Sequence, residues 1–347
     1  MSKSGCKYED KENCRFPYPF SITFAFSSCS GKVQEASFFA MGSVVSVKTY
    51  CKNSQAGQDV CNEITAEISR FDKVISKNDK SAELYSANQS LASGVKVSRE
   101  LFDVVESTKE LFSLSGKKAA VTSGALTELW GFDTDNFNVP SDGEIKSAIP
   151  LCDDSTLELD RGTLTLKAKQ GQILNLGAVG KGAACDKAVD LLLSHEEIKG
   201  AIVSLGGSLA LYGKPSGKDN FTIGIRNPFG EVNDTFATLK LSSCFVSTSG
   251  SYEKTFEKDG VTYHHLLNLT TGKPADNGLC SVTVVAHSGL ESDALSTVCF
   301  VLGEAASYPI LQKYNAEAVF VYSDKTVSVS DGLQDLFTLT DKDFTVE

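Results

Sequence analysis

The sequence predicts an α/β fold of the α+β kind, in which helices pack on mixed or antiparallel sheets. Apolar residues recur at helical spacing in four segments, which are residues 60–75, 99–113, 180–193 and 292–302. Strand-like segments often follow one another directly, and this order favours mixed or antiparallel pairing. They are residues 44–50, 201–205, 221–225, 237–241, 244–247, 281–286, 316–322 and 326–330. The sequence lacks the regular alternation and glycine fingerprint of a Rossmann fold.

Local patterns justify the elements in turn. Ile64, Ile68 and Phe71 fall on one face of the first helix. Residues 86–95 are rich in turn formers, and residues 157–166 predict a hairpin. The helix expected over 180–193 follows a glycine-rich entry, and the helix expected over 292–302 follows a strong strand.

The composition restricts the class of function. The chain has 347 residues, of which 41% are hydrophobic, and a net charge of -11 from 44 acidic and 33 basic residues. No block of lysine and arginine stands out, so nucleic-acid binding has no electrostatic support. An anionic ligand must therefore be bound locally, by backbone N–H groups, a single lysine or a metal.

The N-terminus has the pattern of an exported lipoprotein. Four basic residues precede the apolar segment 16–26, and small residues then precede Cys29. We expect a signal peptide over residues 1–29, lipid on Cys29 that anchors the chain to the inner membrane, and a single periplasmic domain over residues 30–347. The alternative is an ordinary N-terminal tail.

A glycine-rich turn could bind phosphate. Residues 175–182 read Asn-Leu-Gly-Ala-Val-Gly-Lys-Gly and enter a predicted helix. The N–H groups at a helix N-terminus attract anions, and Lys181 adds a positive charge. The spacing differs from that of a Walker A loop. The alternative is a tight strand-to-helix turn without a ligand.

Asp293 and Thr297 could bind a cation together. If residues 293–297 are helical, the two side chains share one face, and a loop carbonyl could complete a set of oxygen ligands. Mg²⁺ prefers such ligands. The alternative is that Asp293 only caps the helix together with Ser292.

Three further segments carry polar groups or glycines in unusual patterns. Residues 247–253 form a hydroxyl-rich segment, expected as a turn after a strand, that could bind phosphate or only make local hydrogen bonds. Of the pair His264 and His265, one could be a base or a ligand and the other is expected to face solvent. Gly206 and Gly207 end a strand and imply the close approach of another backbone or a ligand.

In their order and spacing these motifs resemble the ApbE family, the FAD:protein FMN transferases. The resemblance covers residues 38–345 and also rests on Met41-Gly42-Ser43, on residues 129–132 (Leu-Trp-Gly-Phe) and on Thr271-Gly272-Lys273-Pro274. With its lipoprotein-like start the chain is most similar to the spirochaetal flavin-trafficking members that hydrolyse FAD. The resemblance implies a T-fold-like domain that binds FAD in an extended cleft.

The resemblance also implies roles for individual residues. Ala178, through its carbonyl, would hold Mg²⁺ together with Asp293 and Thr297. His265 would lie near the reacting phosphate, and Lys181 would assist there. The residues expected around FAD are Met41, Asn78, Lys118, Ala119, Ala120, Asn175, Lys181, Ser249, Tyr252 and Leu266. Asp186 could serve a second metal or simply solvate a helix face.

The sequence departs from the family pattern at several positions. Asn78 stands where the family usually has Tyr, Asn175 where it has Asp, and Leu269 where it has Pro; residues 119–122 read Ala-Ala-Val-Thr instead of Phe-Asp-Pro-Thr. Asn78 cannot cover the ligand as a ring would, so water becomes a better competitor for the phosphorus.

We therefore expect Mg²⁺-dependent cleavage of FAD to AMP and FMN as the first activity, with FMN transfer to Thr or Ser of partner flavoproteins as the second. The alternatives are an enzyme that is mainly a transferase and, from another class, a periplasmic carrier that binds FAD without catalysis. A purely structural protein would leave the whole motif set unexplained.

Overall fold

The computed structural model describes residues 32–134 and 136–347. The expected signal peptide and Cys29 lie outside these residues, so the lipoprotein signal stays a prediction from sequence. Among the helices of the described part, none combines the length and apolar character that crossing a membrane requires.

The largest sheet is mixed. Within the described residues it has nine strands in the order β1-β2-β6-β7-β10-β15-β16-β17-β19, antiparallel except for the parallel pair β17–β19. The strands are β1 (Lys32–Ala40), β2 (Ser43–Cys51), β6 (Ile198–Leu205), β7 (Ser208–Gly213), β10 (Cys244–Gly250), β15 (Leu279–Ala286), β16 (Glu317–Tyr322), β17 (Thr326–Val329) and β19 (Thr345–Val346).

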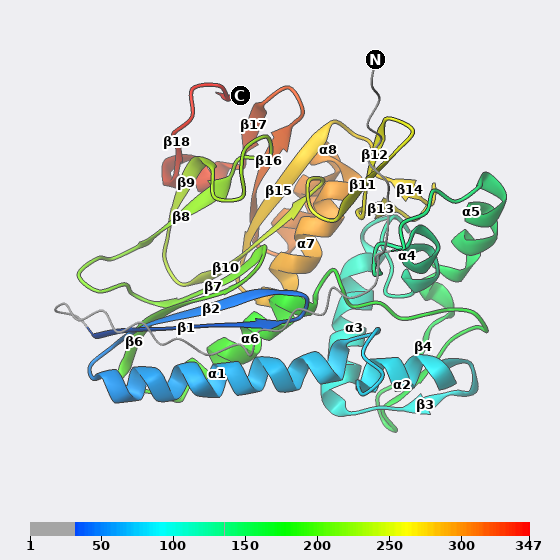
Figure 1. The fold of residues 1–347 in the computed structure, drawn as a ribbon, viewed down its shortest axis with the longest axis horizontal. Helices are drawn as coiled ribbons and strands as arrows, with labels where there is room; N and C mark the ends of the chain where they lie inside the picture. Colours follow the sequence, from blue (N-terminus) through cyan, green and yellow to red (C-terminus); the bar gives the residue numbers. More distant parts are fainter. Residues whose placement is uncertain (1–31, 135) are drawn as a thin grey trace, which may run out of the picture.

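Smaller sheets and helices surround it (Figure 1). One three-stranded sheet consists of β18 (Phe337–Leu339), β9 (Thr235–Leu241) and β8 (Phe221–Arg226), and another of β3 (Val95–Lys96), β5 (Thr165–Lys167) and β4 (Glu158–Asp160). Two hairpin sheets pair β11 (Thr255–Lys258) with β12 (Val261–His264) and β13 (Leu267–Asn268) with β14 (Lys273–Pro274). The helices are α1 (Ser54–Ile75), α2 (Glu83–Ser90), α3 (Arg99–Ser113), α4 (Gly124–Trp130), α5 (Asp142–Ala148), α6 (Gly180–Leu193), α7 (Gly289–Leu302) and α8 (Glu304–Lys313).

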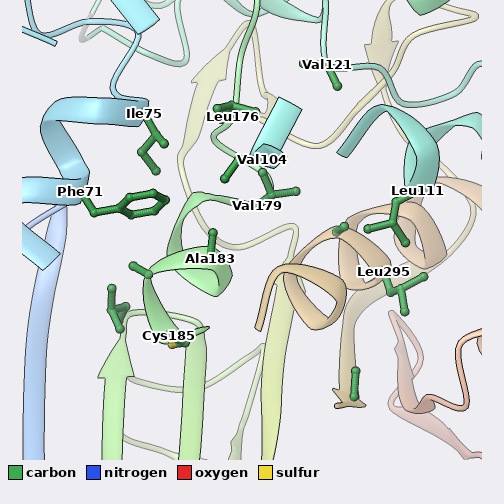
Figure 2. Close-up of a cluster of buried hydrophobic side chains, with 14 of the residues drawn as sticks. Phe71, Ile75, Val104, Leu111, Val121, Leu176, Val179, Ala183, Cys185 and Leu295 are labelled. Carbon is green, nitrogen blue, oxygen red and sulfur yellow. The ribbon is translucent and has the colours of Figure 1, made fainter. Parts of the chain in front are cut away.

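The large sheet is buried on both faces along β15 and β16, whereas alternate residues of β1 and β2 are exposed. Successive side chains of a strand point to opposite faces, and β16 shows the consequence. Ala318 and Phe320 join the core beneath the helices, whereas Val319 and Val321 join a second core under β8 and β9. Figure 2 shows Ile75 of α1, Val179 directly before α6 and Leu295 of α7 among the side chains of the first core.

Helices α6 and α7 approach each other through glycine. A Cβ on Gly182 would lie 2.0 Å from the carbonyl oxygen of Gly289, and a Cβ on Gly289 would lie 2.1 Å from that of Gly182. A side chain at either position would force the helix backbones apart. This crossing places the first turn of α6 directly against α7.

A third hydrophobic cluster surrounds Trp130, the only tryptophan in the sequence. Its indole N–H donates to the Gly272 carbonyl at 2.8 Å, and its ring stacks on Phe132 with centroids 5.9 Å apart. Phe132 in turn meets the ring of His265 edge-on at 6.5 Å. The motif of residues 129–132 is therefore a packing centre beside His265.

The mixed α/β fold with packed helices is confirmed, and helices α3 and α6 have the predicted bounds. The prediction of a turn-rich segment over 86–95 is wrong, because α2 occupies residues 86–90 and a short 3-10 helix follows over residues 91–93. Leu84, Ala87 and Leu91 are buried at helical spacing, and the side chain of Asn88 bonds both the N–H and the carbonyl of Leu174. These tertiary contacts favour a helix that the polar residues obscure in the sequence.

We predict that Gly182→Ala lowers the free energy of unfolding by about 1–3 kcal/mol, because the new methyl group meets backbone atoms of α7. Gly143→Ala in α5 is the matched control. A Cβ there has only the Ser141 hydroxyl at 4.0 Å, so this variant should be neutral or slightly stabilised. Urea unfolding of both variants measures the difference, and equal effects would contradict the importance of the crossing.

Candidate active site

The glycine-rich turn ends at the N-terminus of α6, as the sequence predicted. Helix α6 begins at Gly180, and no side chain caps it. A Cβ on Gly180 would lie 2.7 Å from Ile75 and 3.5 Å from the methyl group of Met41. The positive end of the helix, with the partly buried Lys181 in its first turn, makes this position suitable for a phosphate.

Asp293 is held against this turn. It is 5% exposed, and its carboxylate accepts the N–H of Gly182 at 2.9 Å. Burial raises the pKa of Asp293, and the nearby positive charge of Lys181 opposes the rise. Helix α7 begins at Gly289 with Ser288 as its cap, so the alternative that Asp293 and Ser292 cap the helix is wrong.

The hydroxyl-rich segment forms the expected turn only in its last residues, because β10 continues to Gly250 and the turn follows at residues 251–254. Its hydroxyls instead bind neighbouring elements. Ser247 pairs with Ser292 at 2.8 Å, and Ser249 lies 2.8 Å from Ser296 and 3.2 Å from Thr297, all between hydroxyl oxygens. Ser249 is thus attached to the helix face that carries Thr297.

The donor atoms fit a hard cation. Asp293 and Thr297 lie one turn apart on α7, and Ala178 precedes α6 by two residues. A carboxylate, a hydroxyl and a carbonyl are all oxygen donors, as Mg²⁺ prefers. The described residues contain no group of three or more His, Cys, Asp or Glu placed to bind a metal. A cation here would therefore depend on ligand phosphates for further oxygen atoms.

His265 is half-buried and neutral. Its Nδ1 lies 3.1 Å from the carbonyl oxygen of Glu253, which can only accept, so Nδ1 carries the proton and Nε2 keeps a free lone pair. Burial, assisted by the positive charges of Lys254 and Lys181, lowers the pKa of His265 to about 3. The Nε2 atom is therefore available as a proton acceptor.

His264 does not face solvent, which corrects the expectation for the second histidine. Its Nε2–H donates to the Ala275 carbonyl at 3.1 Å, and its Nδ1 accepts the N–H of Leu266 at 3.3 Å. The ring also packs edge-on against Phe300. Burial lowers the pKa of His264. His264 therefore fixes the strand end that positions His265 and Leu266.

Lys254 is a candidate site residue that sequence reasoning missed. It follows Glu253 with an unusual φ of 39° and lies near Lys181, Lys77 and Asp133. Partial desolvation lowers the pKa of Lys254. A cluster of lysines in an acidic protein suits an anionic ligand, and the position of Lys254 directly after the hydroxyl-rich motif was the available signal.

One unpaired hydroxyl lies beside the glycine-rich turn. The hydroxyl oxygen of Ser43 is buried without a hydrogen-bond partner, and Ser43 lies beside the turn at Gly206, which also approaches Lys181. The Ser208 hydroxyl lies beside Asp293 and opposes the rise in the pKa of its carboxylate. Gly207 leaves room for the backbone of Thr248. The N–H of Thr248 donates to the carbonyl of Gly207 at 2.8 Å. The predicted close approach at this turn is thus explained by β10.

The residues expected around the flavin come from several loops. The N–H of Met41 donates to the Asp72 carboxylate at 2.9 Å, next to Gly180. Asn78 is exposed and donates to the Asp133 carbonyl at 3.3 Å, so it lies beside the lysine cluster.

Other hydrogen bonds join the remaining loops. The N–H of Asn175 donates to the carbonyl of Val121 at 2.8 Å, and the N–H of Leu269 donates to that of Lys118 at 3.0 Å. In the sequence, the buried Ala119 and Ala120 lie between Lys118 and Val121, whose carbonyls accept these two hydrogen bonds. The buried Leu266 lies three residues before Leu269, the donor of the second bond.

Two candidate residues have other surroundings. The ring of Tyr252 packs on Gly250 and lies 4.6 Å from the Arg226 guanidinium. The Asp186 carboxylate accepts the N–H groups of Gly289 and Leu290 at 2.6 and 2.8 Å. Asp186 therefore binds the N-terminus of α7, which neither the second-metal role nor the solvated-face role anticipated.

Known proteins resemble the chain over most of its length. Residues 41–320 match the sequence model of the ApbE family. A Treponema pallidum protein named FAD:protein FMN transferase is 31% identical, over 99% of both chains. A Klebsiella pneumoniae protein of the same name is 27% identical, over 91% of this chain and 97% of its own.

Solved structures agree with these matches. The ApbE protein of Thermotoga maritima aligns with a TM-score of 0.82 and 29% identity, over 88% of this chain and 99% of its own. The flavin transferase ApbE from Vibrio cholerae aligns with a TM-score of 0.74 and 25% identity, over 91% of this chain and 99% of its own.

We predict that His265 makes the fold less stable in acid. The pKa of His265 in the folded chain lies below the usual 6.5. Above pH 6.5 the ring is neutral in both the folded and the unfolded chain, so the shift does not lower the free energy of unfolding there. As the pH falls from 6.5 towards 3, the unfolded chain binds a proton that the folded chain does not, and stability decreases, by up to about 2 kcal/mol at pH 5. Unfolding of wild type and His265→Asn at pH 7 and 5 tests this. Parallel losses in the two proteins would contradict it.

Proposed function

The chain belongs to the ApbE family, and from this premise we propose that it is a Mg²⁺-dependent FAD:protein FMN transferase. A Thr or Ser hydroxyl of a partner flavoprotein attacks the FMN phosphorus of FAD, the new phosphoester bond forms, and AMP leaves with the electrons of the broken pyrophosphate bond. The observation that carries the proposal is the meeting of Lys181 and Asp293 at the N-terminus of α6, with His265 near enough for the positive charge of Lys181 to lower its pKa.

The chain's own groups have separate tasks. The first-turn N–H groups of α6 and Lys181 bind pyrophosphate oxygens, and Lys254 adds a second positive charge. His265 accepts the proton of the attacking hydroxyl at Nε2, and its Nδ1–H remains bound to Glu253. The bound pyrophosphate would raise the pKa of His265 from its low value, because a negative charge favours the protonated ring.

Mg²⁺ would be held by Ala178, Asp293 and Thr297. When bound, the cation would offset negative charge that develops on the pyrophosphate oxygens. Because the protein offers one carboxylate in this set, affinity for the metal should depend strongly on FAD.

Hydrolysis of FAD is proposed as the second reaction of the same site. Water can replace the protein hydroxyl, with FMN and AMP as products. The sequence favoured hydrolysis as the first activity because Asn78 cannot seal the site, whereas the names of the relatives favour transfer. Both reactions use Lys181 and Asp293, so access to the phosphorus decides between them. A carrier that only binds FAD would release no AMP.

We also propose that the protein acts outside the cytoplasm, where lipid on Cys29 anchors it to the inner membrane. The support is the sequence of residues 1–29, which resembles a lipoprotein signal.

The test of the function uses FAD, Mg²⁺ and a Thr-bearing acceptor, with AMP release and covalent flavin fluorescence as readouts. We predict that Asp293→Asn loses roughly 100-fold or more of both activities, because it removes the charge yet can still accept the Gly182 N–H. Thr297→Val should lose less. The control, Asp190→Asn on the exposed face of α6, should retain activity. Near-normal turnover of Asp293→Asn at limiting Mg²⁺ would overturn the metal assignment.

A second prediction concerns the partition between water and protein. Asn78 is exposed beside Lys77 and Asp133. Asn78→Tyr places a ring there and adds no formal charge, so it should lower free FMN production and raise acceptor labelling. A change of about 1.4 kcal/mol in relative barrier alters this ratio tenfold. If the ratio of AMP to labelled acceptor does not change, residue 78 does not control access of water.

A further inference from the structure

A second basic site lies away from the candidate active site. It is a pocket of about 450 Å³ whose lining includes Lys32, Lys199, Lys214 and Lys218. All four lysines are exposed, and they come from the beginning of β1, the beginning of β6 and the segment after β7. The proposed transferase reaction uses none of them.

The local charge is opposite to that of the whole protein. The net charge of the chain is -11, yet the lining holds four lysines and one carboxylate, Asp219. Asp219 pairs with Lys214 at 3.0 Å, but both side chains are exposed and such a pair contributes little. Glu196 and Glu197 lie close in sequence, although Lys199 contacts the carbonyl of Glu196 and not its carboxylate. The pocket therefore keeps net positive charge for an external anion.

The pocket and the active site lie at opposite ends of the same strands. Lys32 begins β1, and Ala40 ends it about 26 Å away for an extended strand, directly before Met41. Strand β6 runs in the same sense, from Ile198 near the pocket to the Gly206 turn near Lys181. Cys29 precedes Lys32 by three residues, a reach of at most roughly 11 Å.

We propose that this lysine pocket rests on the anionic phospholipid headgroups of the membrane that carries the lipid anchor. The phosphate groups of the lipids are the complementary charges, and the position of the lysines beside the anchor makes these lipids the nearest available anions. In this orientation the active site points away from the bilayer, towards partner flavoproteins. The orientation rests on the proposed anchor, whereas the affinity for anionic lipid does not.

The experiment uses the full chain carrying Cys29→Ala, so that lipid on the protein plays no part. Co-sedimentation is measured with vesicles of phosphatidylcholine alone and with added phosphatidylglycerol. We expect binding only to the anionic vesicles, weakened by salt. Replacing Lys199, Lys214 and Lys218 by Gln should reduce binding roughly fivefold for each lysine removed. The control replaces the exposed Lys146, Lys240 and Lys342 by Gln and should bind as before.

Several outcomes would overturn the proposal. They are equal losses in the two triple variants, equal binding to neutral vesicles, or binding of inorganic phosphate at the pocket without any binding of vesicles. AMP release in solution should be unchanged in both triple variants, which verifies folding. The anchor itself is measured separately, as partition of the wild-type chain into detergent and its loss in Cys29→Ala. Failure of the anchor and failure of the pocket can thus be distinguished.

Discussion

The contact between Gly182 and Gly289 is the constraint on which the candidate site depends. Two helices meet here with no side chain between them, because a Cβ on either glycine would clash with the other helix's backbone. The close approach lets the Asp293 carboxylate of α7 accept an N–H from the first turn of α6. It therefore brings a negative group and the positive helix end with Lys181 into one small volume, which neither helix could create alone.

Carboxylates hold the other parts of the site by the same chemistry. Asp72 binds the N–H of Met41, Asp154 binds those of Val121 and Thr122, and Asp186 binds the start of α7. Burial raises the pKa of Asp154 and Asp186, and the backbone hydrogen bonds oppose this rise. Much of the buried negative charge of this acidic chain therefore fixes backbone around the candidate site, while lysines remain to meet the ligand.

Local periodicity explains what could be predicted from sequence. Helix α3 has apolar residues along one face, and a glycine-rich turn marks the start of α6. Asp293 and Thr297 share one helix, so their spacing alone predicts that they lie on the same face. Features set by distant contacts could not be predicted in this way. Helix α2 depends on the bond between Asn88 and Leu174, and the inward ring of His264 depends on Ala275 and Phe300. The proximity of Lys254 to Lys181 likewise arises only when β10 packs against α6 and α7.

The solitary tryptophan gives the protein an optical property. Trp130 is buried, its indole N–H is bound to Gly272, and Phe132 links its ring to His265 of the candidate site. Isoalloxazine rings absorb at the wavelengths where indole emits, so a flavin in the candidate site would quench the fluorescence of Trp130 by energy transfer. With no other indole in the sequence, the emission would report occupancy of this one location. Entry and departure of the ligand could then be followed in real time without a label.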